Sequence, residues 1–265
     1  MDKNIVVIRG GGDLASGVAA CLYEAGFGVV VTELAQPLVV RRAVSFAEAV
    51  YEGTCTVEGI TGRLVNDAGQ ADALVSGREI AVLVDPECAC VESLNPIAIV
   101  DARMLKRDIP NTFDDSHPLI GLGPGFNGGV NCWVAIETNR GAELGKIFET
   151  GSPEPDTGLP ASRMGFSRER VLYASREGVF KTFLKIGDQV DAGQKVAEIE
   201  GELVISQIRG VVRGLLRDGL KVSSGVKVGD IDPSGDPAVC YQISDKARKI
   251  GEAVVKAVRS IETAG

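Results

Sequence analysis

Residues 4–33 read NIVVIRGGGDLASGVAACLYEAGFGVVVTE, and this stretch decides the fold that the sequence predicts. The apolar runs at 5–8 and 28–31 are typical of buried strands, and apolar residues recur at helical spacing between 14 and 25. The three glycines in between therefore lie on a turn from a strand into a helix. Such a turn predicts a strand–helix–strand unit with its glycines at the carboxyl end of the first strand.

Small residues at this turn match a phosphate-binding pattern. Gly10, Gly12 and Ala15 fit the spacing G-x-G-x-x-G/A, which permits a tight turn, close approach of a ligand to the backbone, and close helix packing. Glu33 follows Gly12 by about 20 positions, where dinucleotide-binding enzymes place an acid on the ribose hydroxyls. The stretch predicts a small-molecule site. A turn kept only for its packing is the alternative.

Charged residues near the turn allow two interpretations. Asp13 opens the predicted helix, where it favours the helix dipole but competes with a pyrophosphate for the same amides. Arg41 and Arg42 follow Glu33 and offer forked donors suited to phosphate or carboxylate. In the alternative interpretation, Asp13 only caps the helix and the two arginines form a solvated surface.

The composition is that of an ordinary globular chain, and it excludes several classes of function. The 265 residues are 45% hydrophobic and 24% charged, which suits one large domain and a small one. A formal charge of −8 argues against a nucleic-acid partner. Because the sequence shows neither a signal peptide nor an apolar stretch of about 18 residues, we expect a cytoplasmic protein with no membrane partner.

Six cysteines and one histidine limit the metal and nucleophile chemistry. Cys88 and Cys90 follow a predicted strand at 80–84, at the sheet edge where ligands collect. They are candidates for a sulfur, selenium or metal contact, and incidental thiols are the alternative. Because His117 stands alone, we expect no metal site built on histidine and no Ser-His-Asp triad.

The order of the elements predicts an α/β fold with a Rossmann-like domain at 1–150. Strands near 5–8, 28–33, 80–84 and 97–100 alternate with helices at 14–25 and 43–51, which favours a parallel sheet covered by helices on both faces. A second glycine-rich loop at 121–129 is longer than a hairpin needs. We expect it to face the ligand, with Gly123, Gly125 and Phe126 closing over the site.

A Pro-, Gly- and Ser-rich linker at 151–165 precedes an internal repeat. GVFKTFLKIGDQVDAGQKVAEI, starting at Gly178, recurs 32 positions later as GVVRGLLRDGLKVSSGVKVGDI. Two such copies are too small to bury a core singly, so we expect them to interlock in one all-β unit at 166–240. A C-terminal helix at 241–265, with one apolar face, is expected to pack on the first domain.

The repeat is similar to a carrier-domain fold. The turn GDQVDAG at 187–193 resembles those of the barrel-sandwich hybrid of biotinyl and lipoyl domains, and we expect that fold here. In those domains the modified lysine lies on the hairpin between the half-repeats. The corresponding stretch at 200–209 contains no lysine, so we expect neither biotin nor lipoate.

Several stretches in this order resemble one family. They are GGGDLASGVA at 10–19, TELAQPLVVRRAVSFAEAVYEG at 32–53, TVEGI at 56–60, DARM at 101–104, IGLGPGF at 120–126, ETNRG at 137–141, GLLRDGLKVSSGVKVGDIDP at 214–233 and ISDKARKIG at 243–251. Over nearly the whole chain they resemble the YqeB-type accessory proteins of selenium-dependent molybdenum hydroxylases. The Rossmann part of that family is similar to that of the xanthine dehydrogenase accessory factors.

The resemblance implies a role in the maturation of a molybdenum hydroxylase. It implies binding or insertion of molybdenum cofactor, or delivery of the selenium ligand, by a protein that works with a client hydroxylase. One position departs from the family, because Ala142 stands after ETNRG where a histidine is expected. A mechanism that depends on that histidine is therefore not expected here.

We thus expect an accessory protein that binds molybdenum cofactor (molybdopterin), a dinucleotide or a related phosphate-bearing nucleotide at the Rossmann edge. An NAD(P)-dependent oxidoreductase and a non-catalytic scaffold that docks the hydroxylase and its cofactor donor are the alternatives. We expect a homo-oligomer, and no catalytic residue can be assigned. The expected cofactor-binding residues are Gly10, Gly11, Gly12, Asp13, Ala15, Ser16, Glu33, Arg41, Arg42, Gly123, Gly125 and Phe126, with Cys88 and Cys90 as a chalcogen contact.

Overall fold

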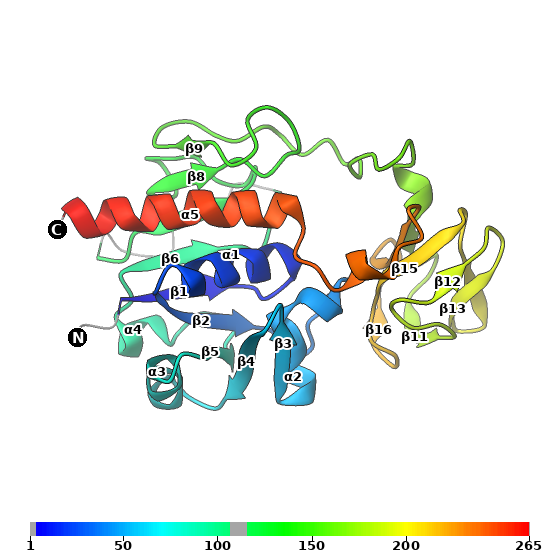
Figure 1. Cartoon of the computed structure of the whole chain (residues 1–265), viewed down its shortest axis with the longest axis horizontal. Coiled ribbons are helices and arrows are strands. Elements are labelled where there is room, and N and C mark those ends of the chain that lie inside the picture. The colour runs from blue at the N-terminus through cyan, green and yellow to red at the C-terminus, as the bar shows by residue number, and fades with distance from the viewer. Residues whose placement is uncertain (1–3, 107–115, 265) are drawn as a thin grey trace. The chain divides into compact units, whose positions relative to one another are not determined.

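The computed structural model describes residues 4–106 and 116–264, which fall into two compact units (Figure 1). The α/β unit comprises the residues up to Pro37, Ser45–Thr157, and the residues from Ile243 onward. The β unit comprises Leu38–Val44 and Gly158–Gln242. Each unit has a hydrophobic core of its own.

The α/β unit is built on a nine-stranded sheet in the order β3-β4-β5-β2-β1-β6-β7-β8-β9 (Figure 1). Neighbouring strands from β4 to β8 are parallel, whereas β3 and β9 pair antiparallel with β4 and β8 at the two edges. The strands are β1 (Ile5–Arg9), β2 (Gly28–Glu33), β3 (Thr54–Val57), β4 (Ile60–Val65), β5 (Ile80–Val84), β6 (Ala98–Asp101), β7 (Leu119–Leu122), β8 (Val134–Ile136) and β9 (Ile147–Phe148).

The predicted fold class, a Rossmann-like parallel sheet followed by a barrel-sandwich-hybrid domain, is wrong. The large sheet is mixed, and the region after it contributes two separate antiparallel sheets. Short connections explain the mixed character of the large sheet. Only Glu58 and Gly59 join β3 to β4, with φ angles of 47° and 83°, and this is a hairpin turn rather than the long crossover that parallel neighbours need.

The two sheets of the β unit have four strands each, in the orders β10-β17-β15-β12 and β14-β13-β11-β16. Their short strands are exchanged between the repeats, because β12 of the first copy pairs with β15 and β16 of the second copy pairs with β11. The expected interlocking of the copies is confirmed. The strands are β10 (Val171–Tyr173), β11 (Gly178–Thr182), β12 (Gln189–Val190), β13 (Lys195–Ile199), β14 (Glu202–Ile205), β15 (Gly210–Leu215), β16 (Lys221–Val222) and β17 (Lys227–Asp232).

Two helices pack closely against each other in the α/β unit (Figure 1). They are α1 (Asp13–Glu24) and the C-terminal helix α5 (Asp245–Ala264), which packs within the first unit as expected. The shorter helices are α2 (Ala49–Glu52), α3 (Ala68–Ser76) and α4 (Val91–Leu94). Among the described residues, no helix combines the length and the apolar character that crossing a membrane would need.

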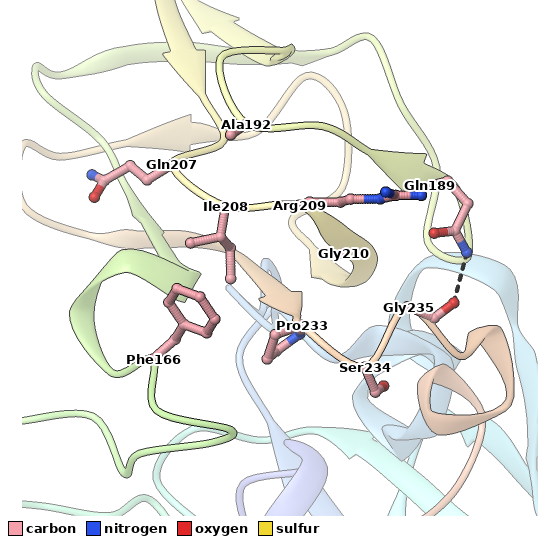
Figure 2. Close-up of a pocket in the computed structure, with 10 residues that line it drawn as sticks. All are labelled: Phe166, Gln189, Ala192, Gln207, Ile208, Arg209, Gly210, Pro233, Ser234 and Gly235. Carbon is pink, nitrogen blue, oxygen red and sulfur yellow. Dashed lines mark hydrogen bonds between the residues drawn. The ribbon is translucent and has the colours of Figure 1, made fainter.

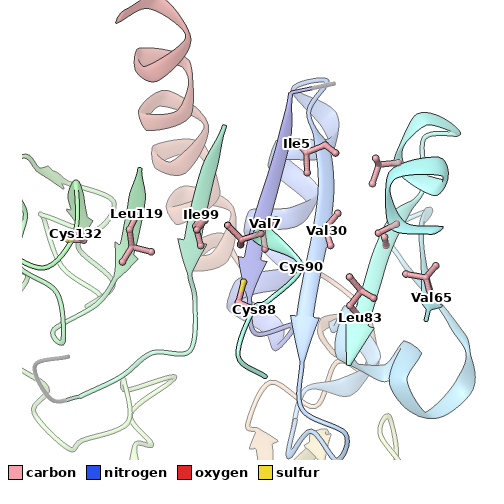
Figure 3. Packing of buried hydrophobic residues seen from close by; sticks show 14 of the residues in the cluster. Ile5, Val7, Val30, Val65, Leu83, Cys88, Cys90, Ile99, Leu119 and Cys132 are labelled. Atoms are coloured by element: carbon pink, nitrogen blue, oxygen red, sulfur yellow. The ribbon is translucent and has the colours of Figure 1, made fainter. Parts of the chain in front are cut away.

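The central strands β1 and β6 are buried along their whole length, and β5 is buried up to its last residue, Val84, as their continuous apolar runs predict. One face of the sheet carries a cluster that includes Ile5, Val7, Val30 and Ile99 (Figure 3). Burial of this face fixes the register of the strands, since a shift by one residue would turn these side chains to the opposite face. The fixed register also fixes the positions of the carboxyl ends of neighbouring strands relative to one another.

Candidate functional site

The glycine turn lies where the sheet changes its direction of growth. From β1 the chain adds β2 and later β4 and β5 on one side, and it then returns to the other side of β1 to add β6, β7 and β8. Ligands of open α/β sheets bind outside the carboxyl ends of the strands at such a point. We call the turn Gly10–Gly12, the first turn of α1 and Glu33 the edge site.

The three positions of the turn differ in what their surroundings require of the residue. Gly10 has a φ of 92° and donates its amide to the Thr32 carbonyl over 2.8 Å. A Cβ atom on Gly11 would stand 2.9 Å from the Ala47 amide nitrogen, so Gly11 is required by packing. A Cβ atom on Gly12 would have no neighbour within 4 Å. Gly12 is therefore the position at which a ligand can approach the backbone.

The amino terminus of α1 lacks a side-chain cap. Gly12 is the N-cap residue, with φ −65° and ψ −179°, and within residues 4–106 and 116–264 no side-chain cap hydrogen bond is made at this helix start. Ser16 does not serve as a cap, because its hydroxyl donates to the Gly11 carbonyl and accepts the Phe46 amide. Unbonded amides at a helix start favour an anion. Ala15 is buried, whereas Asp13 is partly exposed at the start of the helix.

Glu33 reaches back to the glycine turn. Its Oε1 accepts the Gly11 amide over 2.7 Å, and its Oε2 accepts the Leu34 amide over 2.8 Å. Burial raises the pKa of the Glu33 carboxyl, although the two amide hydrogen bonds act in the opposite direction. Glu33, which the sequence predicts to bind ribose hydroxyls, is thus hydrogen-bonded to the backbone of the glycine turn.

Arg41 and Arg42 belong to the β unit rather than to the unit that carries the glycine turn. Arg41 donates to the carbonyls of Val239 and Gln242, over 3.1 and 3.0 Å. The Arg42 Nε donates to the Leu215 carbonyl over 3.0 Å. Both guanidinium groups therefore bond backbone carbonyls within the β unit.

The second glycine-rich loop is packed on itself. The ring of Phe126 lies against Gly121, where an added Cβ would stand 2.1 Å from the ring, and Phe126 is only 1% exposed. Gly123 has a φ of 92° and donates its amide to the Ile136 carbonyl. Gly125 donates its amide to the Leu105 carbonyl. Most of the polar backbone that this loop offers is used within the α/β unit.

Cys88 and Cys90 lie in a turn after β5, close to the core beneath β1 and β2 (Figure 3). Asp85 accepts the amides of Ala89 and Cys90 and so fixes this turn. A hydrogen bond from Cys90 and the charge of Arg9 hold the pKa of the Cys88 thiol below its usual 9.0 despite burial. The same pair interaction, together with burial, raises the pKa of Cys90. The thiols are 2% and 8% exposed, which limits access by a reagent or ligand.

A charged group outside the expected set lies at the ends of β1 and β6. Asp101 is 1% exposed, and its Oδ2 accepts the Arg103 guanidinium over 2.6 Å. Arg9 stands 3.7 Å from the same oxygen and donates to the Pro86 carbonyl over 3.2 Å. Two guanidinium groups thus surround one carboxylate beside the glycine turn.

Lys246 is a second residue that sequence reasoning missed. It lies in the first turn of α5, and its ammonium interacts electrostatically with Asp13, Arg140 and Glu137. Burial lowers the pKa of this lysine, repulsion from Arg140 lowers it further, and the two carboxylates oppose the shift. The stretch ISDKARKIG contained this lysine, but only the closeness of α5 to α1 places it near the turn.

The β unit contains a cavity of about 660 Å³ (Figure 2). Its walls come from residues 207–210, residues 233–235, Phe166 and Gln189, and the Gln189 Nε2 donates to the Gly235 carbonyl over 2.7 Å. Arg209, at the rim, is largely exposed and stands 3.7 Å from Asp191. None of the expected site residues lines this cavity. Among the described residues, no group of three or more His, Cys, Asp or Glu side chains is placed to hold a metal ion.

The chain is a homologue of a protein of unassigned function. It is 44% identical over 254 residues to "Uncharacterized protein YqeB" of Escherichia coli strain K12, in an alignment that covers 96% of this chain and 47% of YqeB. The chain therefore spans about half the length of that relative. This confirms the resemblance to YqeB-type proteins. No family model matches the chain.

Similarity to solved structures is weak. An aspartoacylase family protein from Mesorhizobium loti aligns with a TM-score of 0.28 and 11% identity, over 87% of this chain and 85% of that one. The ectoine utilization protein EutE (DoeB) from Ruegeria pomeroyi aligns with a TM-score of 0.25 and 10% identity, over 85% of both chains. TM-scores this low do not establish a shared fold.

Proposed function

We propose that the α/β unit binds a phosphate-bearing ligand, molybdenum cofactor or a related nucleotide, at the edge site. The observation that carries this proposal is the open Gly12 at the uncapped start of α1. The amides of the first helical turn supply donors for phosphate oxygens, and the helix dipole favours the negative charge. The position of the turn at the switch in strand order supports the same conclusion.

The residues present fit the phosphate part of such a ligand. Val at Gly12 would fill the space that a phosphate needs, because nothing else stands within 4 Å of that position. Glu33 uses one lone pair of each oxygen for an amide, and the remaining lone pairs can accept a hydroxyl or amino group of the ligand. The proposal does not use Arg41 and Arg42, which donate to backbone carbonyls of the β unit.

We further propose that this binding serves the maturation of a molybdenum hydroxylase. The resemblance to YqeB-type accessory proteins supports this role, and YqeB carries no assigned activity. An oxidoreductase would need a group that moves the substrate proton near the cofactor. His117 precedes β7 and thus lies at the amino end of its strand, opposite the edge at which Gly12 lies. This placement favours a binding role over nicotinamide-dependent redox chemistry.

Calorimetry with NAD, NADP and molybdenum cofactor, side by side under anaerobic conditions, tests the binding proposal. We expect molybdenum cofactor to bind, and Gly12→Val to weaken binding about 100-fold or more, because at least two amide contacts to a charged group are lost. Gly69→Val is the matched control, since Gly69 is exposed in α3, which follows β4, three strands from β1 in the sheet. Its affinity should equal that of the wild type.

Three other outcomes would each contradict the proposed site, ligand or role. Equal affinity of Gly12→Val and wild type would remove the ligand from the edge site. Binding of a nicotinamide dinucleotide alone would favour the oxidoreductase. If Gly12→Val still supported hydroxylase maturation in cells that lack the wild-type chain, the scaffold role would replace the cofactor-binding role.

A further inference from the structure

The contact between α1 and α5 brings the starts of both helices to the same edge of the sheet. A Cβ atom on Gly17 would stand 2.5 Å from the Ala247 Cβ, and one on Gly251 would stand 2.6 Å from the Cys21 Sγ. The contacts advance together along both helices, so the helices run parallel. Only glycine at these two positions permits so close an approach. The first turn of α5 therefore lies beside the first turn of α1.

Lys246 occupies that first turn of α5 and is partly buried. The charged groups that face it are Asp13 at the start of α1, Glu137 at the end of β8, and Arg140 in the loop that follows. Arg140 is paired with Asp245 through two hydrogen bonds of 2.7 Å. The Glu137 oxygens accept the amides of Asn139 and Glu154.

Lys246 itself has no direct partner within residues 4–106 and 116–264. Among the described residues, no hydrogen bond or ion pair joins its ammonium to another group, and Arg140, Asp13 and Glu137 act on it electrostatically. Burial of this side chain disfavours the charged ammonium, and the carboxylates of Asp13 and Glu137 offset part of that cost. The start of a helix is also an unfavourable place for a cation. Packing of α5 on α1 nevertheless holds the lysine there.

We propose that Lys246 contacts the phosphate of the ligand bound at the edge site and supplies the counter-charge that the first turn of α1 lacks. The inference rests on the proposed function and names a contact residue for it. The negative charge of Asp13 repels an anion at this helix start, and the positive charge of Lys246 offsets that repulsion. The phosphate of the ligand thus supplies a negative charge for the ammonium of Lys246 at the two helix starts.

Binding should then be linked to proton uptake. In the free protein, burial and Arg140 hold the pKa of Lys246 below its usual 10.5, so part of the population is neutral at alkaline pH. A bound phosphate favours the charged form and raises this pKa. The ligand therefore binds together with a proton, and its affinity falls as the pH rises above the lowered pKa of the free lysine.

Calorimetric titration with ADP, in pairs of buffers of different ionisation enthalpy, measures this uptake. The phosphates of ADP are fully ionised from mildly alkaline pH upward, so they do not contribute there. We expect the wild type to take up protons on binding, increasingly so toward alkaline pH. Lys246→Arg should bind with similar affinity and without uptake, because arginine stays charged. Lys246→Met should bind about tenfold more weakly or worse.

The outcomes separate this inference from the proposed function. If ADP binds the wild type, and Lys246→Met keeps the full affinity and the full proton uptake, the role of Lys246 is overturned while the edge site stands. If ADP, NAD and molybdenum cofactor all fail to bind the wild type, the proposed function itself fails. Lys249→Met, an exposed substitution in the same helix, should leave both affinity and uptake unchanged.

Discussion

The two glycine-rich segments of the α/β unit look alike in the sequence and differ in the structure. At 10–12, Gly12 borders open space beside an uncapped helix. At 121–129, added Cβ atoms on Gly121 and Gly128 would stand 2.1 Å from the Phe126 ring and the Phe148 carbonyl oxygen. The space beside Gly12 is open to a ligand, whereas the space beside Gly121 and Gly128 is filled by other groups of the protein. Glycine content alone does not distinguish these uses.

Alanine substitution should separate the two segments most strongly. Gly121→Ala should lower the free energy of unfolding by about 3 kcal/mol, because the new methyl group overlaps the Phe126 ring. Gly12→Ala should change it by less than about 1 kcal/mol, because its φ of −65° suits alanine and nothing lies nearby. Urea denaturation of both variants measures the difference. Equal stability losses would contradict the contrast between a closed and an open glycine segment.

The second effect in size concerns Glu33, which holds the open turn. Its pKa is raised in the folded state by burial, so folding favours the protonated form. The wild type should lose stability as the pH rises from the unfolded pKa of glutamate through the raised folded value, and this loss should then level off. Glu33→Gln should lack this decline. Denaturation of both proteins at several pH values between acid and neutral provides the test, and parallel curves would contradict a raised pKa.

The smallest effect concerns the thiol pair beneath the turn. The hydrogen bond from Cys90 is the main cause that lowers the pKa of Cys88, so Cys90→Ala should raise that pKa. The alkylation rate of Cys88, followed by peptide mass spectrometry, should then begin to rise at a higher pH than in the wild type. Cys132→Ala is a control, because that buried thiol lies after β7 and away from the pair. An unchanged pH profile in Cys90→Ala would remove Cys90 as the cause.

The sequence predicted the elements that carry strong apolar patterns. The strands β1, β2, β5 and β6 and the helices α1 and α5 lie where the runs and helical spacing placed them. The interlocking of the two repeats also followed from their size. By contrast, β3 (TCTV) is short and largely exposed on one side, so it gives no burial pattern, and its omission led to the wrong expectation of a purely parallel sheet.

The candidate site was only partly predictable. Gly12 and Glu33 were found because their positions follow a local pattern that physical chemistry explains. Arg41 and Arg42 were expected to meet a ligand, but their local charge pattern could not show that they bond carbonyls of the β unit. Lys246 was missed because it is far from Asp13 in the sequence, and only the contact between α1 and α5 brings the two residues near each other. Long-range packing, rather than local pattern, decides such positions.

The central claim is that a phosphate binds at the uncapped start of α1. The most direct measurement is the change in backbone amide chemical shifts on titration with ADP and with molybdenum cofactor. If a phosphate binds there, the largest changes are expected at residues 12–15, with smaller changes around Glu33 and Lys246. Changes confined to the cavity lined by residues 207–210 and 233–235, or no saturable changes at residues 12–15, would contradict it.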